Sequence, residues 1–162
     1  PQTVGVGLGW NYANRLRLGL DYTLQQWGRA TSPALETLAD GSQVFRKADN
    51  LLTDRHRVSF GAEYTPDPDA LSWAPRVRYR LGLSYASPYV KVDNHDGPSS
   101  YVATLGVGLP IITSRNNRSM LNVSARYELL QPAVTGALKE QFFGLSVGLS
   151  FGDKWFDKWK VE

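Results

Sequence analysis

Eight charged side chains recur on the polar side of segments in which polar and apolar residues alternate. Charges on one face of a sheet could line a polar pathway or dock a plug domain. They could equally pair with one another, because a buried charge is costly unless it is paired, and this network of mutual pairs is the simpler interpretation. The eight residues are Arg17, Asp21, Arg57, Glu63, Arg78, Arg80, Arg126 and Glu128.

The chain has two histidines, His56 and His95, and few other groups suited to catalysis. The run from Asp93 to Gly97 around His95 offers oxygen ligands but lacks the spacing of a calcium loop, so a solvated turn is the simpler interpretation. The sequence has no His-Glu-x-x-His or Gly-rich phosphate motif, and the Gly-x-Ser-x-Gly match at residues 144–148 lies within an alternating strand segment rather than at the strand-to-helix turn of a nucleophile elbow. We therefore expect no enzymatic activity, no metal and no cofactor, with a hydrolase built at the rim of a barrel as the remaining alternative.

Composition narrows the class of protein further. The 162 residues include no cysteine, so a disulfide framework is excluded. The 18 basic and 15 acidic residues are scattered, which argues against a nucleic-acid partner because such a partner requires a basic patch. The mean hydropathy is −0.32. The sequence contains no run of about 18 apolar residues, so it predicts no membrane helix.

The charged residues must be positioned by β-strands, because apolar and polar residues alternate with a period of two. Most alternating segments are about ten residues long, the length of a tilted membrane strand, whereas strands of soluble proteins are about five or six. The segments span residues 3–12, 15–27, 57–64, 77–87, 101–111, 120–129 and 142–151. Aromatic residues near the ends of many apolar faces also favour a membrane barrel over a soluble sandwich. These aromatic residues are Trp10, Tyr12, Tyr22, Tyr64, Tyr85, Tyr101, Tyr127, Phe143 and Phe151.

The pattern thus predicts an all-β, antiparallel transmembrane β-barrel with about seven strands over residues 1–151, in the outer membrane of a Gram-negative bacterium. Long connections such as residues 28–54 are expected on the outer side, and short ones in the periplasm. Residues 152–162 are then expected to form a periplasmic amphipathic tail. Bacterial barrels have even strand counts, so we expect these seven strands to be part of a larger barrel whose other strands lie outside this chain.

Several of these segments resemble the FadL-type family of outer-membrane transporters for hydrophobic compounds. The resemblance rests on the order of the strand motifs, although Gly28 stands where the family usually has serine. The motifs are Pro1–Tyr12, Leu18–Tyr22, Gln26–Gly28, Arg80–Tyr85, Gly106–Pro110 and Gly148–Phe156. The resemblance implies a barrel of about fourteen strands plugged by a hatch, with this chain as its C-terminal half, and uptake of hydrophobic molecules such as long-chain fatty acids.

Two functions follow as expectations. The first is a channel that passes hydrophobic small molecules, with membrane lipid around it and a hydrophobic ligand as cargo. The alternative is a barrel of the same kind acting as a structural subunit of a secretion or assembly complex, with other outer-membrane proteins as partners. The long connection contains Leu35 and Leu38, and these apolar residues could receive a ligand, cover the barrel mouth or contact a partner.

Overall fold

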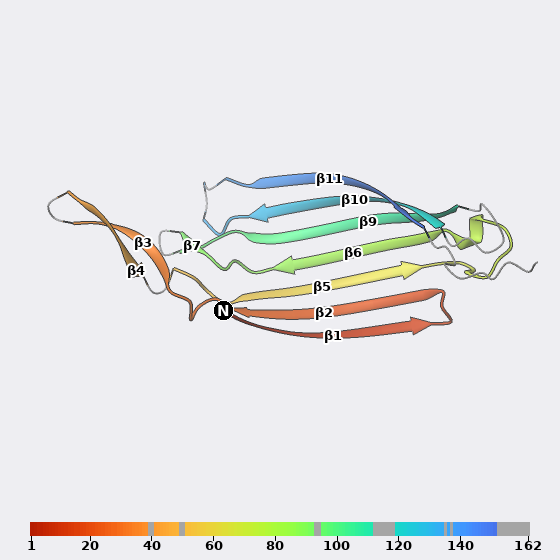
Figure 1. Cartoon of the computed structure of the whole chain (residues 1–162), viewed down its shortest axis with the longest axis horizontal. Helices are drawn as coiled ribbons and strands as arrows, with labels where there is room; N and C mark the ends of the chain where they lie inside the picture. Colours follow the sequence, from red (N-terminus) through yellow and green to blue (C-terminus); the bar gives the residue numbers. More distant parts are fainter. Residues whose placement is uncertain are drawn as a thin grey trace, which may run out of the picture.

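A single seven-stranded antiparallel sheet forms the body of the protein (Figure 1). The computed structural model describes residues 1–38, 41–48, 51–92, 95–111, 119–134, 136 and 138–151. The strands lie in the order β1-β2-β5-β6-β9-β10-β11, so each neighbours the next of the long strands along the chain. They are β1 (Gln2–Tyr12), β2 (Leu16–Gln26), β5 (Arg55–Tyr64), β6 (Arg78–Ala86), β9 (Ser99–Ile111), β10 (Ser119–Gln131) and β11 (Glu140–Ser150).

The seven strands correspond to the seven alternating segments, which confirms the all-β antiparallel prediction. The pairing register then gathers residues of the same kind into rows across the sheet, because side chains alternate between its faces. One row runs Leu8, Leu20, Phe60, Leu83, Ala103, Tyr127 and Phe143. One face is therefore apolar on every strand, and the other carries glycine, serine and charge.

The seven strands form an open sheet, and among the described residues they do not close into a barrel. Strands β1 and β11 stand at the two edges of the sheet and do not pair with each other. Every neighbouring pair in the sheet is antiparallel, so an odd number of strands leaves β1 and β11 running in the same direction. A direct β1–β11 seam would therefore be parallel, unlike every other pair in the sheet.

The connections at one end of the sheet contain additional short strands that the alternation did not predict. The predicted loop at residues 28–54 contains a hairpin of β3 (Ser32–Thr37) and β4 (Gln43–Ala48), which projects beyond the sheet (Figure 1). Strands β7 (Lys91–Val92) and β8 (His95–Asp96) form a smaller pair between β6 and β9. Within the hairpin, Leu35 lies opposite Phe45, and their side chains are exposed.

The opposite end of the sheet is built from a tight turn and a folded loop. Ala13 and Asn14 both have positive φ, at 50° and 55°, and the Arg15 amide donates to the Tyr12 carbonyl at 2.9 Å. The loop between β5 and β6 contains a short 3-10 helix, η1 (Ala74–Arg76). The Thr65 amide fastens its start by donating to the Arg15 carbonyl at 2.7 Å. The predicted tail at residues 152–162 lies outside the described residues.

The sheet is one layer thick and lacks a conventional hydrophobic core. Among the described residues, only Val77 and Ala86 are buried hydrophobic side chains. On β6 the apolar residues Tyr79, Leu81, Leu83 and Tyr85 are exposed, while the polar residues between them are half-buried. The apolar face is thus the more accessible one, the reverse of a protein folded around an apolar interior. No helix in the described ranges has the length and apolar character needed to cross a membrane.

Candidate functional site

All eight charged residues singled out from the sequence lie on the polar face of the sheet. The register places Arg17 opposite Glu63, and Glu63 opposite Arg80, in one row across β2, β5 and β6. Arg126 and Glu128 lie on β10, Asp21 on β2 and Arg78 at the start of β6. Arg57 stands near the other end of the sheet, opposite Thr23 and Ala86. The predicted role of these residues, as a polar pathway or as a contact surface for a plug domain, stays a prediction.

Glu63 is the centre of the largest polar network. Its carboxylate lies 2.7 Å from Arg80 Nε and 3.4 Å from Arg17 Nη1. The Glu63 side chain is only 20% exposed, against 37% for Arg80 and 54% for Arg17. A carboxylate held between two arginines on neighbouring strands offsets one of their two positive charges, and the shorter contact is a charge-assisted hydrogen bond.

The network continues across a strand that contributes no side chain to it. Arg80 Nη1 donates to Asn122 Oδ1 at 2.8 Å, although β9 lies between β6 and β10. The β9 residues opposite Arg80 and Asn122 are Gly106 and Gly108. A Cβ atom on Gly108 would lie 3.3 Å from Asn122 Oδ1, so glycine leaves the space that lets the two side chains meet. Asn122 Nδ2 in turn donates to Ser150 Oγ at 3.3 Å.

A second, smaller cluster lies farther along β10. Arg126 Nη2 and Glu128 Oε2 are 2.6 Å apart, and Ser100 Oγ donates to Glu128 Oε1 at 2.9 Å. Asp21 and Arg57 have no ion pair within the described part of the chain. The charges therefore form two separate paired groups, with some cations and one carboxylate left over.

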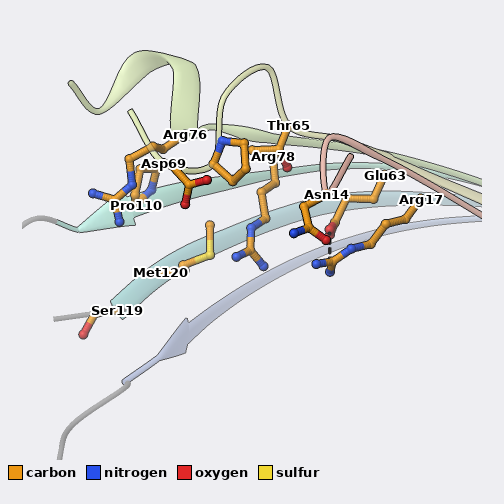
Figure 2. A pocket seen from close by; sticks show the side chains of 11 residues that line it. Asn14, Arg17, Glu63, Thr65, Asp69, Arg76, Arg78, Pro110, Ser119 and Met120 are labelled. Carbon is orange, nitrogen blue, oxygen red and sulfur yellow. Dashed lines mark hydrogen bonds and ion pairs between the residues drawn. The ribbon is translucent and has the colours of Figure 1, made fainter. Parts of the chain in front are cut away.

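A polar cavity of about 330 Å³ lies at the turn end of this face (Figure 2). The β1–β2 turn, the 65–77 loop and the adjoining ends of β6, β9 and β10 enclose it. Figure 2 shows Arg78 extending between Met120 and Asn14, with Arg76 and Asp69 beside Pro110. Its lining residues are Asn14, Arg17, Glu63, Thr65, Pro68, Asp69, Arg76, Arg78, Pro110, Ser119 and Met120.

Sequence reasoning found three of the charged residues of this cavity and missed two. Arg17, Glu63 and Arg78 were identified because they follow the strand alternation. Asp69 and Arg76 lie in the 65–77 loop, which has no periodicity that could assign them to a face. The loop returns over the sheet because the Asp67 amide donates to the Pro75 carbonyl at 2.8 Å, a contact between residues eight positions apart.

Neither histidine lies in the polar networks. Tyr22 Oη and His56 Nδ1 are 2.8 Å apart, and both residues share the side of the sheet that carries the apolar rows. His95 lies in β8 at the loop end, while its neighbours Asp93 and Asn94 lie outside the described residues. In the ranges that are described, no three His, Cys, Asp or Glu residues are grouped so that they could hold a metal ion.

Comparison with known proteins gives a family. The comparisons with curated proteins and with solved structures gave no match. The family model described as BamG matches residues 1–162, the entire chain. BamG is related to the BAM complex, the outer-membrane assembly complex, which agrees with the alternative of a structural subunit.

The assignment to the FadL-type family is wrong, and the family that matches supports the subunit alternative better than the transporter function. The family model that covers the whole chain is BamG and not a FadL-type transporter. The motifs behind the resemblance alternate glycine or polar residues with apolar ones, a pattern that membrane β-strands share whatever their family. With a match from the first residue to the last, the chain belongs to the BamG family.

Proposed function

We propose that this protein is a non-enzymatic structural subunit of an outer-membrane assembly complex. One observation carries the proposal: the BamG family model extends over residues 1–162. The geometry supports a scaffold role, because the polar side chains form ion pairs and hydrogen bonds with each other. Such pairs satisfy charges on a partly buried face and hold neighbouring strands in register.

The proposal places the sheet in the outer membrane with its apolar face toward lipid. Leu8, Leu105 and Leu145, on three different strands, are 72%, 63% and 71% exposed. An apolar surface that spans seven strands far exceeds the patches that proteins expose to water. Strands of 9 to 13 residues fit the hydrocarbon thickness when they are tilted.

The two free edges of the sheet indicate that further strands complete it. An exposed edge strand is normally protected by charge or proline, because its unpaired amides otherwise recruit other chains. Strand β1 has neither within its 11 residues, and β11 carries only Glu140, at its first position. The projecting hairpin, by contrast, carries Pro33, Glu36, Arg46 and Lys47.

The direction of the two edge strands determines whether an odd or an even number of strands must be added. Because β1 and β11 run in the same direction, an antiparallel barrel requires an odd number of additional strands. A second copy of these seven strands in the same membrane orientation would give two parallel seams. We therefore propose that strands outside this sheet, odd in number, close the barrel.

Hydrogen–deuterium exchange of the full-length protein in detergent micelles tests barrel closure. We expect the amides of β1 and β11 to be protected as strongly as those of the central strand β6, because edge amides that are paired exchange slowly. The exposed hairpin β3–β4 is the internal reference for fast exchange. Edge strands that exchange as fast as this hairpin would show that the sheet stays open.

Purification of the tagged full-length protein from outer membranes tests the subunit role. We expect other outer-membrane assembly proteins to co-purify in stoichiometric amount after mild detergent extraction. Crosslinking before extraction distinguishes partners that detergent removes from partners that were never bound. A protein recovered alone after both procedures would contradict the subunit role.

A further inference from the structure

The cavity at the turn end carries more positive charge than its own residues neutralise. Three arginines and two carboxylates line it, Arg17, Arg76 and Arg78 against Glu63 and Asp69. The Glu63 carboxylate is already shared between Arg17 and Arg80, which lies just outside the lining. Four arginines therefore face two carboxylates in this part of the polar face.

Two of these arginines are available to a ligand. No ion pair or side-chain hydrogen bond joins Arg76 or Arg78 to any other residue of the ranges that the structure describes. Both are half-buried and line the same cavity of about 330 Å³. A guanidinium has five donors in a planar fork, and a half-buried one with free donors favours an oxyanion that can accept two hydrogen bonds.

We propose that this cavity binds a carboxylate side chain of a partner protein through Arg76 and Arg78. The cavity opens on the polar face of the sheet, whereas membrane lipids would surround the apolar face, so a protein carboxylate suits this position better than a membrane phosphate. A volume of about 330 Å³ admits an acidic side chain together with its flanking backbone. This inference rests on the proposed subunit role. It places one contact with a partner protein at this cavity and makes that contact a carboxylate–arginine pair.

Peptide binding tests the cavity directly. The probe is a fluorescein-labelled, end-capped hexapeptide of alternating glycine and glutamate, titrated against the full-length protein in uncharged detergent and followed by fluorescence anisotropy. The same peptide with glutamine in place of glutamate measures the contribution of the carboxylates. We expect the glutamine peptide to bind about tenfold more weakly or worse, as the loss of a charge-assisted hydrogen bond implies.

Substitutions locate the site on the protein. The double variant R76Q/R78Q should weaken binding of the glutamate peptide about tenfold or more. Arg57→Gln removes the same charge from the same face at the far end of the strands and should leave binding unchanged. The variant R76K/R78K keeps both charges but loses the planar fork, so it should bind with intermediate strength, and it supplies a folded comparison if the glutamine variant does not fold.

Each contrary result has a definite meaning. Equal loss in Arg57→Gln and R76Q/R78Q would show a general attraction to a basic face and overturn the site. Binding of inorganic phosphate that displaces the peptide below millimolar concentration, with equal affinity for both peptides, would identify a phosphate site instead. If partner proteins still co-purify with R76Q/R78Q while peptide binding by the wild-type protein is absent, the cavity assignment fails and the subunit role stands.

Discussion

The Glu63 carboxylate on β5 accepts a hydrogen bond from Arg80 Nε on β6 at 2.7 Å, and through Arg80 it is connected to Asn122 on β10. The first contact reinforces the backbone pairing of β5 and β6, and the second links β6 to β10, two strands that do not pair through their backbones. The polar face is thereby held together where a soluble protein would use an apolar core.

Replacing Glu63 by glutamine should destabilise the sheet. The substitution leaves Arg17 and Arg80 without their shared counter-charge, and because Glu63 is only 20% exposed we expect the free energy of unfolding to fall by about 1–2 kcal/mol. Urea unfolding in detergent micelles, followed by tryptophan fluorescence, measures the change. Asp21→Asn on the same face is the matched control, since Asp21 has no ion pair in the described part of the chain. Equal effects would deny Glu63 its central role.

Arginine substitutions along β11 should distinguish the two faces of the sheet. Arginine at Leu145, a residue that is 71% exposed on the apolar face, should cost about 2–4 kcal/mol near the bilayer midplane. Arginine at the adjacent Ser146, which faces the polar side opposite Ser124, should cost much less. Unfolding in lipid vesicles is the measurement. Equal costs at the two positions would refute the proposal that the apolar face contacts lipid.

Filling the space above β9 should disrupt the network that crosses it. In Gly108→Ala the new methyl group would lie 3.1 Å from Met120 Cε and 3.3 Å from Arg78 Cβ, so we expect a loss of about 1–2 kcal/mol in unfolding free energy. Gly61→Ala is the control, because a Cβ atom there would meet nothing within 4 Å. That change should be neutral or slightly stabilising. A loss as large at Gly61 would assign the effect to the backbone rather than to crowding.

The β1–β2 turn offers a stabilising substitution. Ala13 has φ of 50°, a left-handed conformation that costs an alanine about 1 kcal/mol, whereas asparagine adopts it more readily. Ala13→Asn should therefore raise the unfolding free energy by about 0.5–1 kcal/mol, measured by the same urea titration. Ala86→Asn, at a buried strand position, should be destabilising and shows that asparagine itself is not the cause.

The projecting hairpin offers a second surface for a partner in the proposed complex. Leu35 and Phe45 lie opposite each other and are 52% and 76% exposed. Replacing both by serine should reduce co-purification of assembly proteins without changing the stability of the seven-stranded sheet. The variant E36Q/R46Q, which removes an exposed ion pair of the same hairpin, is the control. Full co-purification with the serine variant would exclude this surface as the main contact.

The sequence by itself determined which residues share a face. Side chains alternate along a strand, so the positions of Leu8, Leu20 and Glu63 relative to their neighbours follow from parity alone. The number and extent of the seven strands followed from the same pattern. The sequence motifs did not determine the family, because Gly-Leu-Gly and similar motifs occur in membrane β-strands of many families.

The tertiary structure decided which of those residues meet. Glu63 could have paired with any cation on its face, and the register brought it to Arg17 and Arg80. Arg80 reaches Asn122 only because Gly106 and Gly108 place no side chain on this face of the intervening strand β9. Arg76 joined the cavity because a loop without periodicity folded back through hydrogen bonds between its own backbone groups. Such contacts depend on strand pairing and loop closure between residues distant in sequence, and alternation along a single strand carries no information about them.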